Sequence, residues 1–162
     1  MSSFPEYTAV VTLTPAQIKS LHTAPVLIAP GVAGTIVDIR NLFFELNPGT
    51  IPYTLGGGGT DALVLFTGSV SGGVPNADVF LPYNLSPANG FMDQTIPLCF
   101  FNFPWWEGPF VGDSGVPVSV IKGQGIYAYQ FDANGVSVQS GANWTNGNGT
   151  LRIYITYAYI EA

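Results

Sequence analysis

The sequence predicts an all-β protein: a single antiparallel β-sandwich, jelly-roll-like, with one short helix near residues 15–21. Apolar and polar residues alternate with a period of two over most of the chain, which is the pattern of strands with one buried face. Gly and Pro are frequent, with 20 and 13 copies in 162 residues, so turns must divide the chain into short strands. Many short strands separated by turns are typical of sandwiches and barrels, and a jelly roll is the leading case.

The chain is expected to begin with an arm and to continue as one domain. Residues 1–6 are polar and show no alternation, so we expect an N-terminal arm that reaches a neighbouring molecule, followed by the β-sandwich domain over residues 7–162. A strand is indicated where Tyr7, Ala9, Val11 and Leu13 alternate with Thr and Val. Thr14 is then a suitable N-cap, Pro15 suits the first helical position, and Gln17 completes a capping box, so a short helix should follow and end before Pro25.

The remaining chain alternates between strand and turn signals. Further strands are expected at residues 26–29, 35–46 (with a bend midway), 61–67, 79–81, 98–103, 116–121, 125–131 and 151–159. In the last strand Leu151, Ile153, Ile155, Tyr157 and Tyr159 should share one face, with Arg152, Tyr154, Thr156 and Ala158 on the other. Because tyrosines occur on both faces, neither face is expected to be simply solvated.

Charged residues are scarce. A chain of this length normally carries roughly 40 of them, and this one has 4 basic and 10 acidic residues, a net charge of −6. Uncharged polar groups could cover the exterior, but we favour burial against other chains, where charged residues are depleted. Four cations also argue against nucleic-acid binding through phosphates, and no apolar run is long enough to span a membrane.

Catalytic and metal-binding signals are weak. His22 is the sole histidine, it falls at the end of the short helix, and no Gly-x-Ser-x-Gly turn occurs. Glu107, Asp113 and Asp132 could supply a glycosidase carboxylate pair, but ten acids always offer such pairs. The segments 132–135 and 113–115 resemble parts of calcium loops and are better interpreted as turns. We therefore expect no enzyme activity, no catalytic residue, no metal site and no cofactor.

Three sequons, at Asn84, Asn143 and Asn148, are interpreted as ordinary turn residues, because the N-terminus shows no secretory signal peptide.

The densest aromatic segment, residues 100–110, contains the candidate contact residues. Trp105, Trp106 and Phe110 lie among Pro and Gly and are expected in a loop. Adjacent tryptophans can stack on sugar rings, or anchor a protein interface, where Trp is a preferred residue. They can also cap one end of the sandwich within a single subunit, and the sequence leaves these alternatives open.

Two terminal segments resemble a group of tailed-phage virion proteins. Residues 7–21, 23–28 and 30–34 are similar to their opening, and residues 146–157 to their C-terminal strand. The resemblance implies a β-rich structural protein of the virion, made in the host cytoplasm, and transfers no catalytic residue. A capsid decoration (cement) protein at the capsid surface is favoured. It would form a homotrimer and bind the major capsid protein or another virion protein. The alternative is a tail or fibre module that binds host-surface glycans through the aromatic loop.

Overall fold

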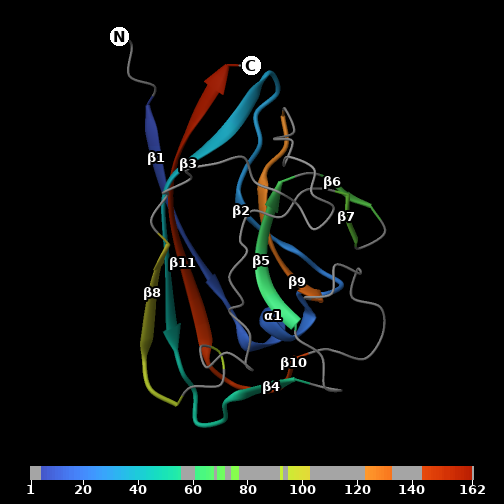
Figure 1. The fold of residues 1–162 in the computed structure, drawn as a ribbon, viewed down its shortest axis with the longest axis vertical. Coiled ribbons are helices and arrows are strands. Elements are labelled where there is room, and N and C mark those ends of the chain that lie inside the picture. Colours follow the sequence, from blue (N-terminus) through green and yellow to red (C-terminus); the bar gives the residue numbers. More distant parts are fainter. Residues whose placement is uncertain are drawn as a thin grey trace.

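The described part of the chain is strand-rich, with antiparallel sheets and a single short helix. The computed structural model describes residues 5–55, 61–67, 69–71, 74–76, 92, 95–102, 123–132 and 144–161. The strands expected at residues 79–81 and 116–121 lie outside these ranges. Within them, each of the other expected strands is present, and Figure 1 shows that they form two main groups facing each other.

The larger group is a four-stranded sheet in the order β1-β11-β3-β8, at the left of Figure 1. Its strands are β1 (Glu6–Leu13), β11 (Thr150–Glu161), β3 (Thr35–Asn47) and β8 (Leu98–Asn102). Glu6 pairs with Ala158, so it belongs to the first strand rather than to the expected arm. The register between β11 and β3 shifts between Thr156 and Tyr157, and this bulge provides the bend predicted midway along β3.

The smaller group is a three-stranded sheet in the order β2-β9-β5, at the right of Figure 1. It consists of β2 (Val26–Ala29), β9 (Ile126–Asp132) and β5 (Asp61–Thr67). Two short ladders complete the described strands: β4 (Tyr53–Leu55) pairs with β10 (Trp144–Asn146), and β6 (Ser69–Ser71) pairs with β7 (Val74–Asn76). The sequence did not predict these ladders, because three residues are too few to show a period of two.

The helix α1 (Pro15–Ser20) forms where the capping signals predicted it. The Thr14 hydroxyl accepts a hydrogen bond from the Gln17 amide, and the Gln17 side chain accepts one from the Thr14 amide at 3.0 Å. The expected end at residue 21 differs by one residue, because Leu21 is the C-cap. Ile18 and Leu21 are fully buried, so the helix closes one end of the core.

One hydrophobic cluster joins the inner faces of both sheets. In β11 the side chains predicted to share a face do so: Leu151, Ile153 and Ile155 are fully buried, Tyr157 is 6% exposed, and Tyr159 is partly buried against the same cluster. Tyr154 lies on the opposite face and is half-buried, so neither face of β11 is simply solvated, as predicted. The other members of the cluster come from β1, α1, β2, β3, β4, β5, β9 and β10, together with Leu21 and Met92.

Candidate functional site

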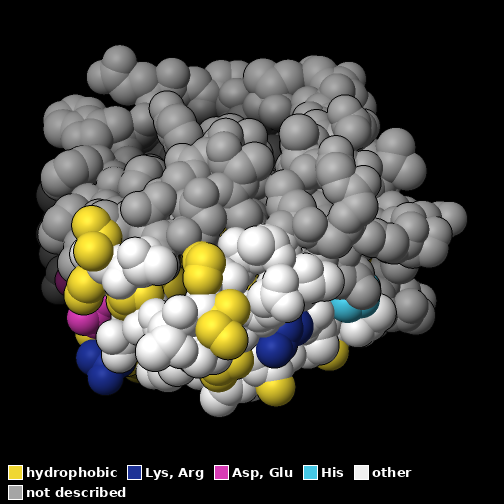
Figure 2. Space-filling view, turned by 90° about the horizontal axis from the view of Figure 1, so that it is seen from below, with side chains coloured by type: hydrophobic (Ala, Val, Ile, Leu, Met, Phe, Trp, Pro, Cys, Tyr) yellow, Lys and Arg dark blue, Asp and Glu magenta, His cyan; other side chains and the backbone are white. Residues whose placement is uncertain are grey.

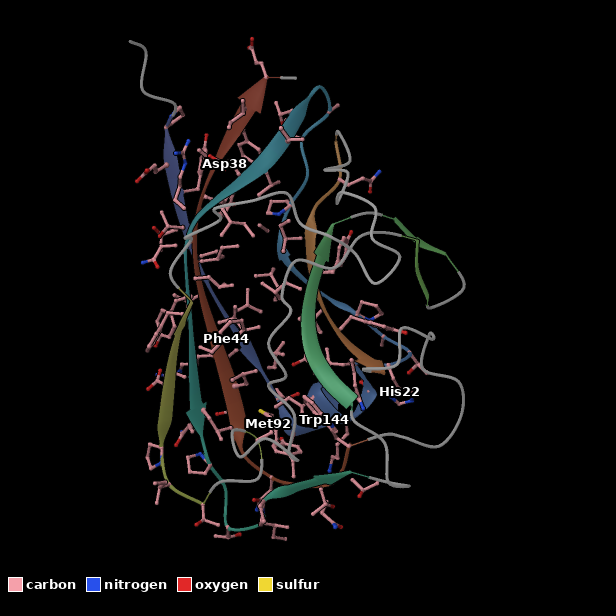
Figure 3. All side chains as sticks on the ribbon, viewed as in Figure 1. His22, Asp38, Phe44, Met92 and Trp144 are labelled. Atoms are coloured by element: carbon pink, nitrogen blue, oxygen red, sulfur yellow. The ribbon has the colours of Figure 1, made fainter. Side chains whose placement is uncertain are left out.

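The predicted contact residues Trp105, Trp106 and Phe110 lie outside the described residues, and so do Glu107 and Asp113. Their assignment to a loop, an interface or a sugar platform therefore stays a prediction. The third tryptophan, Trp144, is 1% exposed and packs against Tyr53 with ring centroids 6.2 Å apart. Trp144 is thus a core residue near the lower end of the molecule, as Figure 3 shows.

His22 follows the end of α1 and is half-buried (Figure 3). Its Nδ1 atom is buried and has no hydrogen-bond partner. Burial lowers the pKa of the ring, and a backbone hydrogen bond with Lys19 raises it less strongly. In a catalytic triad, a hydrogen-bond acceptor next to Nδ1 orients the histidine ring, and His22 has no such acceptor.

The lowered pKa of His22 makes stability depend on pH in a defined direction. As the pH falls, His22 takes up a proton in the unfolded chain before it does so in the folded protein. The contribution of His22 to the free energy of unfolding should therefore be fully present above the unfolded pKa of about 6.5. It should decrease as the pH falls toward the lower folded pKa. Since the chain has one histidine, its ring-proton NMR signal can be titrated without assignment. His22→Gln should remove this part of the pH dependence in urea melts, and a folded pKa at or above the ordinary value would contradict the assignment.

The lower end of the molecule carries an unusually constrained turn between β10 and β11. Asn146 and Gly147 both have positive φ, at 54° and 60°, in the left-handed region that Gly and Asn adopt most readily. The Asn148 side chain then binds the loop after β3: its Oδ1 accepts from the Ile51 amide at 2.9 Å, and its Nδ2 donates to Thr50 Oγ1 at 3.1 Å. Asn148 therefore lies in a turn, where the sequence analysis placed it, and the other two sequon residues, Asn84 and Asn143, lie outside the described residues.

We call this lower end the turn platform and define it as residues 47–54, 95–97 and 144–149 together with Lys19. Ile51 and Ile96 are exposed on it, by 51% and 57%. The hydroxyls of Thr54 and Thr145 lie 3.1 Å apart, and Lys19 Nζ donates to the Gly147 carbonyl at 3.4 Å. Figure 2 looks at this end and shows hydrophobic side chains scattered among uncharged ones. Side chains of both charges lie at the left edge, a Lys or Arg side chain lies near the centre, and the histidine lies at the right.

The turn platform is rigid and free of carboxylates. Its backbone is held by hydrogen bonds between segments about a hundred positions apart in sequence, such as Tyr53 OH to the Gly149 carbonyl at 2.6 Å. None of its residues is Asp or Glu, and Lys19 is its sole charged residue, although the whole chain has a net charge of −6. A pre-ordered surface of this kind loses little conformational entropy on binding, and it best fits a partner that offers carboxylate or carbonyl oxygens to the lysine.

A second surface is the outer face of the four-stranded sheet, which points away from β2, β9 and β5. Phe43 and Tyr154 lie on it with ring centroids 5.1 Å apart, and Val10 beside them is 53% exposed. The Tyr154 hydroxyl donates to Glu45 Oε2 at 2.7 Å, and Arg152 also pairs with this carboxylate at 3.5 Å. The face thus combines apolar contact area with polar groups that already have partners.

Neither a metal-binding cluster nor a membrane-spanning helix is present in the described ranges. No group of three or more His, Cys, Asp or Glu side chains there could hold a metal ion. No helix in that part of the chain is long and apolar enough to cross a bilayer.

Comparison with known proteins gives no relative: no family model, no curated protein and no solved structure matches the chain.

Sequence reasoning missed both surfaces. The turn platform could have been suspected from the repeated Asn-Gly pairs at residues 146–149, which favour positive φ. The outer face was signalled only by the aromatic Tyr154 at a position opposite to the core face of its strand.

Proposed function

We propose that this protein is a capsid decoration (cement) protein of a tailed phage, which binds the assembled head as a homotrimer and stabilises it. The observation that carries the proposal is the strand order of the two larger sheets, which supports a β-sandwich of the jelly-roll type. Jelly rolls are the fold of many viral capsid domains, and also of lectins.

The support from strand order follows from how a jelly roll is built. Folding a long antiparallel hairpin of eight strands pairs the first with the eighth, the second with the seventh, the third with the sixth and the fourth with the fifth. Rolling it then adds pairs between eighth and third and between seventh and fourth. In chain order, strands one to four correspond to β1, β2, β3 and β5, and strands six to eight correspond to β8, β9 and β11. With this numbering the observed ladders are the expected ones: β1·β11, β2·β9, β3·β8, β11·β3 and β9·β5. The remaining pair would need a fifth strand between β5 and β8 in sequence, a stretch that the structure describes only in part.

The distribution of charge also supports a protein that works inside an assembly. A chain with 14 charged residues exposes 8317 Å² as a single molecule, and apolar side chains are exposed on both main surfaces described above. The turn platform is suited to face the shell, because it is rigid, carboxylate-free and carries apolar tips. A protein that binds the assembled lattice more tightly than free capsid subunits stabilises the lattice by mass action.

The proposal predicts a specific binding experiment. Purified protein should have a light-scattering mass of three times 17.2 kDa and should co-sediment with heads of the encoding phage, raising their melting temperature. Ile51→Glu places a carboxylate on the turn platform and should weaken head binding by about tenfold or more, the effect of losing a central contact residue. Leu27→Glu is the matched control, since Leu27 is 45% exposed on β2 and should tolerate the same change.

Several outcomes would contradict this function. Mass spectrometry of virions that does not find the chain would exclude membership of the particle. Absence of head binding together with binding to host-surface glycans, abolished by Trp105→Ala with Trp106→Ala, would favour the tail or fibre module instead.

A further inference from the structure

We propose that the turn between β10 and β11 is a site of spontaneous deamidation, and that its hydrogen bonds decide the order in which its two Asn-Gly pairs react: Asn146 first and Asn148 later. Such a modification is a property of the folded chain itself. The inference therefore goes beyond the proposed function and does not rest on head binding.

The reaction needs an asparagine side chain and the backbone nitrogen of the next residue. A following glycine favours it, because glycine has no side chain to hinder that nitrogen and leaves the backbone free to rotate. The nitrogen attacks the asparagine Cγ atom: an N–Cγ bond forms, the Cγ–Nδ2 bond breaks, and Nδ2 leaves as ammonia with the proton of the backbone amide. Water then opens the succinimide ring at either carbonyl and gives aspartate or isoaspartate. One conversion changes the net charge from −6 to −6 − 1 = −7.

The turn contains two such pairs in succession, Asn146-Gly147 and Asn148-Gly149. Both asparagines are exposed, so water has access to either side chain. Figure 1 places β10, and with it the start of this turn, at the lower end of the molecule beside β4. Exposure does not distinguish the two asparagines, so any difference in rate must come from how each side chain is held.

The Asn148 side chain is held through both of its polar atoms. Its Oδ1 accepts from the Ile51 amide at 2.9 Å, and its Nδ2 donates to Thr50 Oγ1 at 3.1 Å. The Asn148 backbone amide also donates to the Ile51 carbonyl at 3.2 Å. Ring closure makes Cγ tetrahedral and expels Nδ2, so it removes the bond to Thr50 and moves Oδ1 away from the Ile51 amide. Asn148 therefore reacts only when this part of the turn opens.

The Asn146 side chain is held by fewer bonds. Its Nδ2 donates to Thr54 Oγ1 at 3.1 Å, and within the described part of the chain its Oδ1 has no hydrogen-bond partner. The Thr54 hydroxyl also lies 3.1 Å from the Thr145 hydroxyl, so it keeps a partner when Asn146 moves away. The second side-chain hydrogen bond of Asn148 corresponds to a reaction about two- to tenfold slower than that of Asn146.

Site-resolved mass spectrometry of the full chain tests this order, because each conversion replaces NH by O at one residue. Protein is incubated in mildly alkaline buffer, folded and, in parallel, unfolded in urea. In urea the two asparagines should convert at similar rates, since both precede glycine. In the folded protein Asn146 should convert about two- to tenfold faster than Asn148. Two further Asn-Gly pairs, at residues 89–90 and 134–135, lie outside the described residues and are resolved by the same peptide maps.

Two threonine variants separate the hydrogen bonds from the rest of the turn. Thr50→Val removes the acceptor of Asn148 Nδ2 and should raise the rate at Asn148 by about two- to tenfold, with Asn146 unchanged. Thr54→Val is the matched control, since it removes the acceptor of Asn146 Nδ2 and should act on Asn146 alone. Both threonines are exposed, so each variant should fold, which circular dichroism checks.

Three results would overturn the inference. The first is folded wild-type protein in which Asn148 converts as fast as Asn146 or faster. The second is folded protein in which neither asparagine converts while both convert in urea, and the third is a folded Thr50→Val variant with an unchanged rate at Asn148. The first two are measured on the wild-type chain, so they decide even if a variant does not fold. Failure of the proposed function would leave all three measurements unaffected.

Discussion

Phe44→Ala should reduce the free energy of unfolding by about 3–5 kcal/mol, the usual cost of removing a buried phenylalanine ring. Phe44 is fully buried in the hydrophobic cluster and lies opposite Ile153 in β3 and β11. Figure 3 shows it between the two larger sheets. Small domains have a total stability of about 5–15 kcal/mol, so this change should shift the urea midpoint strongly, as measured by circular dichroism.

The neighbouring residue provides the control for this prediction. Phe43 has the same side chain but lies half-buried on the outer face, so Phe43→Ala removes contact with Tyr154 and opens no cavity in the core. We expect a loss of about 1 kcal/mol or less within the folded subunit. Both variants must be compared at the same protein concentration, since association adds to apparent stability. Equal losses would mean that the two faces of β3 are assigned incorrectly.

The contrast between these two phenylalanines shows what the sequence could predict about the fold. Alternation with a period of two determines which residues share a face, so the inner and outer sides of β11 were predicted correctly. The helix was predicted because its capping residues act over three positions. The β4·β10 ladder was not predicted, because it joins Tyr53 to Asn146 across a long sequence separation and has no pattern of its own.

The candidate surfaces were less predictable than the fold. The apolar part of the outer face depends on register, which brings residues 10, 154 and 43 side by side. Register results from the packing of the whole sheet, and a single sequence does not state it. The turn platform similarly depends on Asn148 reaching Ile51, 97 positions away. Sequence reasoning instead selected Trp105, Trp106 and Phe110 for their residue type, and these remain predictions about a segment outside the described ranges.

Gly147→Ala, a substitution in the turn platform, is expected to cause the second large loss of stability. Gly147 has φ of +60°, where an L-residue costs about 1–2 kcal/mol. An added Cβ would also overlap the Tyr53 ring, whose Cδ1 atom would be 2.1 Å away. Moving that ring should break its hydrogen bond to the Gly149 carbonyl, worth about 0.5–1.5 kcal/mol. We therefore expect a total loss of about 1.5–3.5 kcal/mol in urea melts.

Gly34→Ala separates backbone strain from the loss of packing. Gly34 also has positive φ, at +84°, but an added Cβ would meet nothing within 4 Å, so only the strain of about 1–2 kcal/mol remains. Alkaline titration gives an independent readout, because burial raises the pKa of Tyr53 to about 12. In Gly147→Ala the displaced Tyr53 phenol should have a pKa nearer the ordinary value of about 10. The Tyr53→Phe variant shows which part of the tyrosinate absorbance comes from Tyr53. If both glycine variants lose equal stability and Tyr53 titrates as before, the close packing of this turn against the Tyr53 ring cannot be what holds the platform in place.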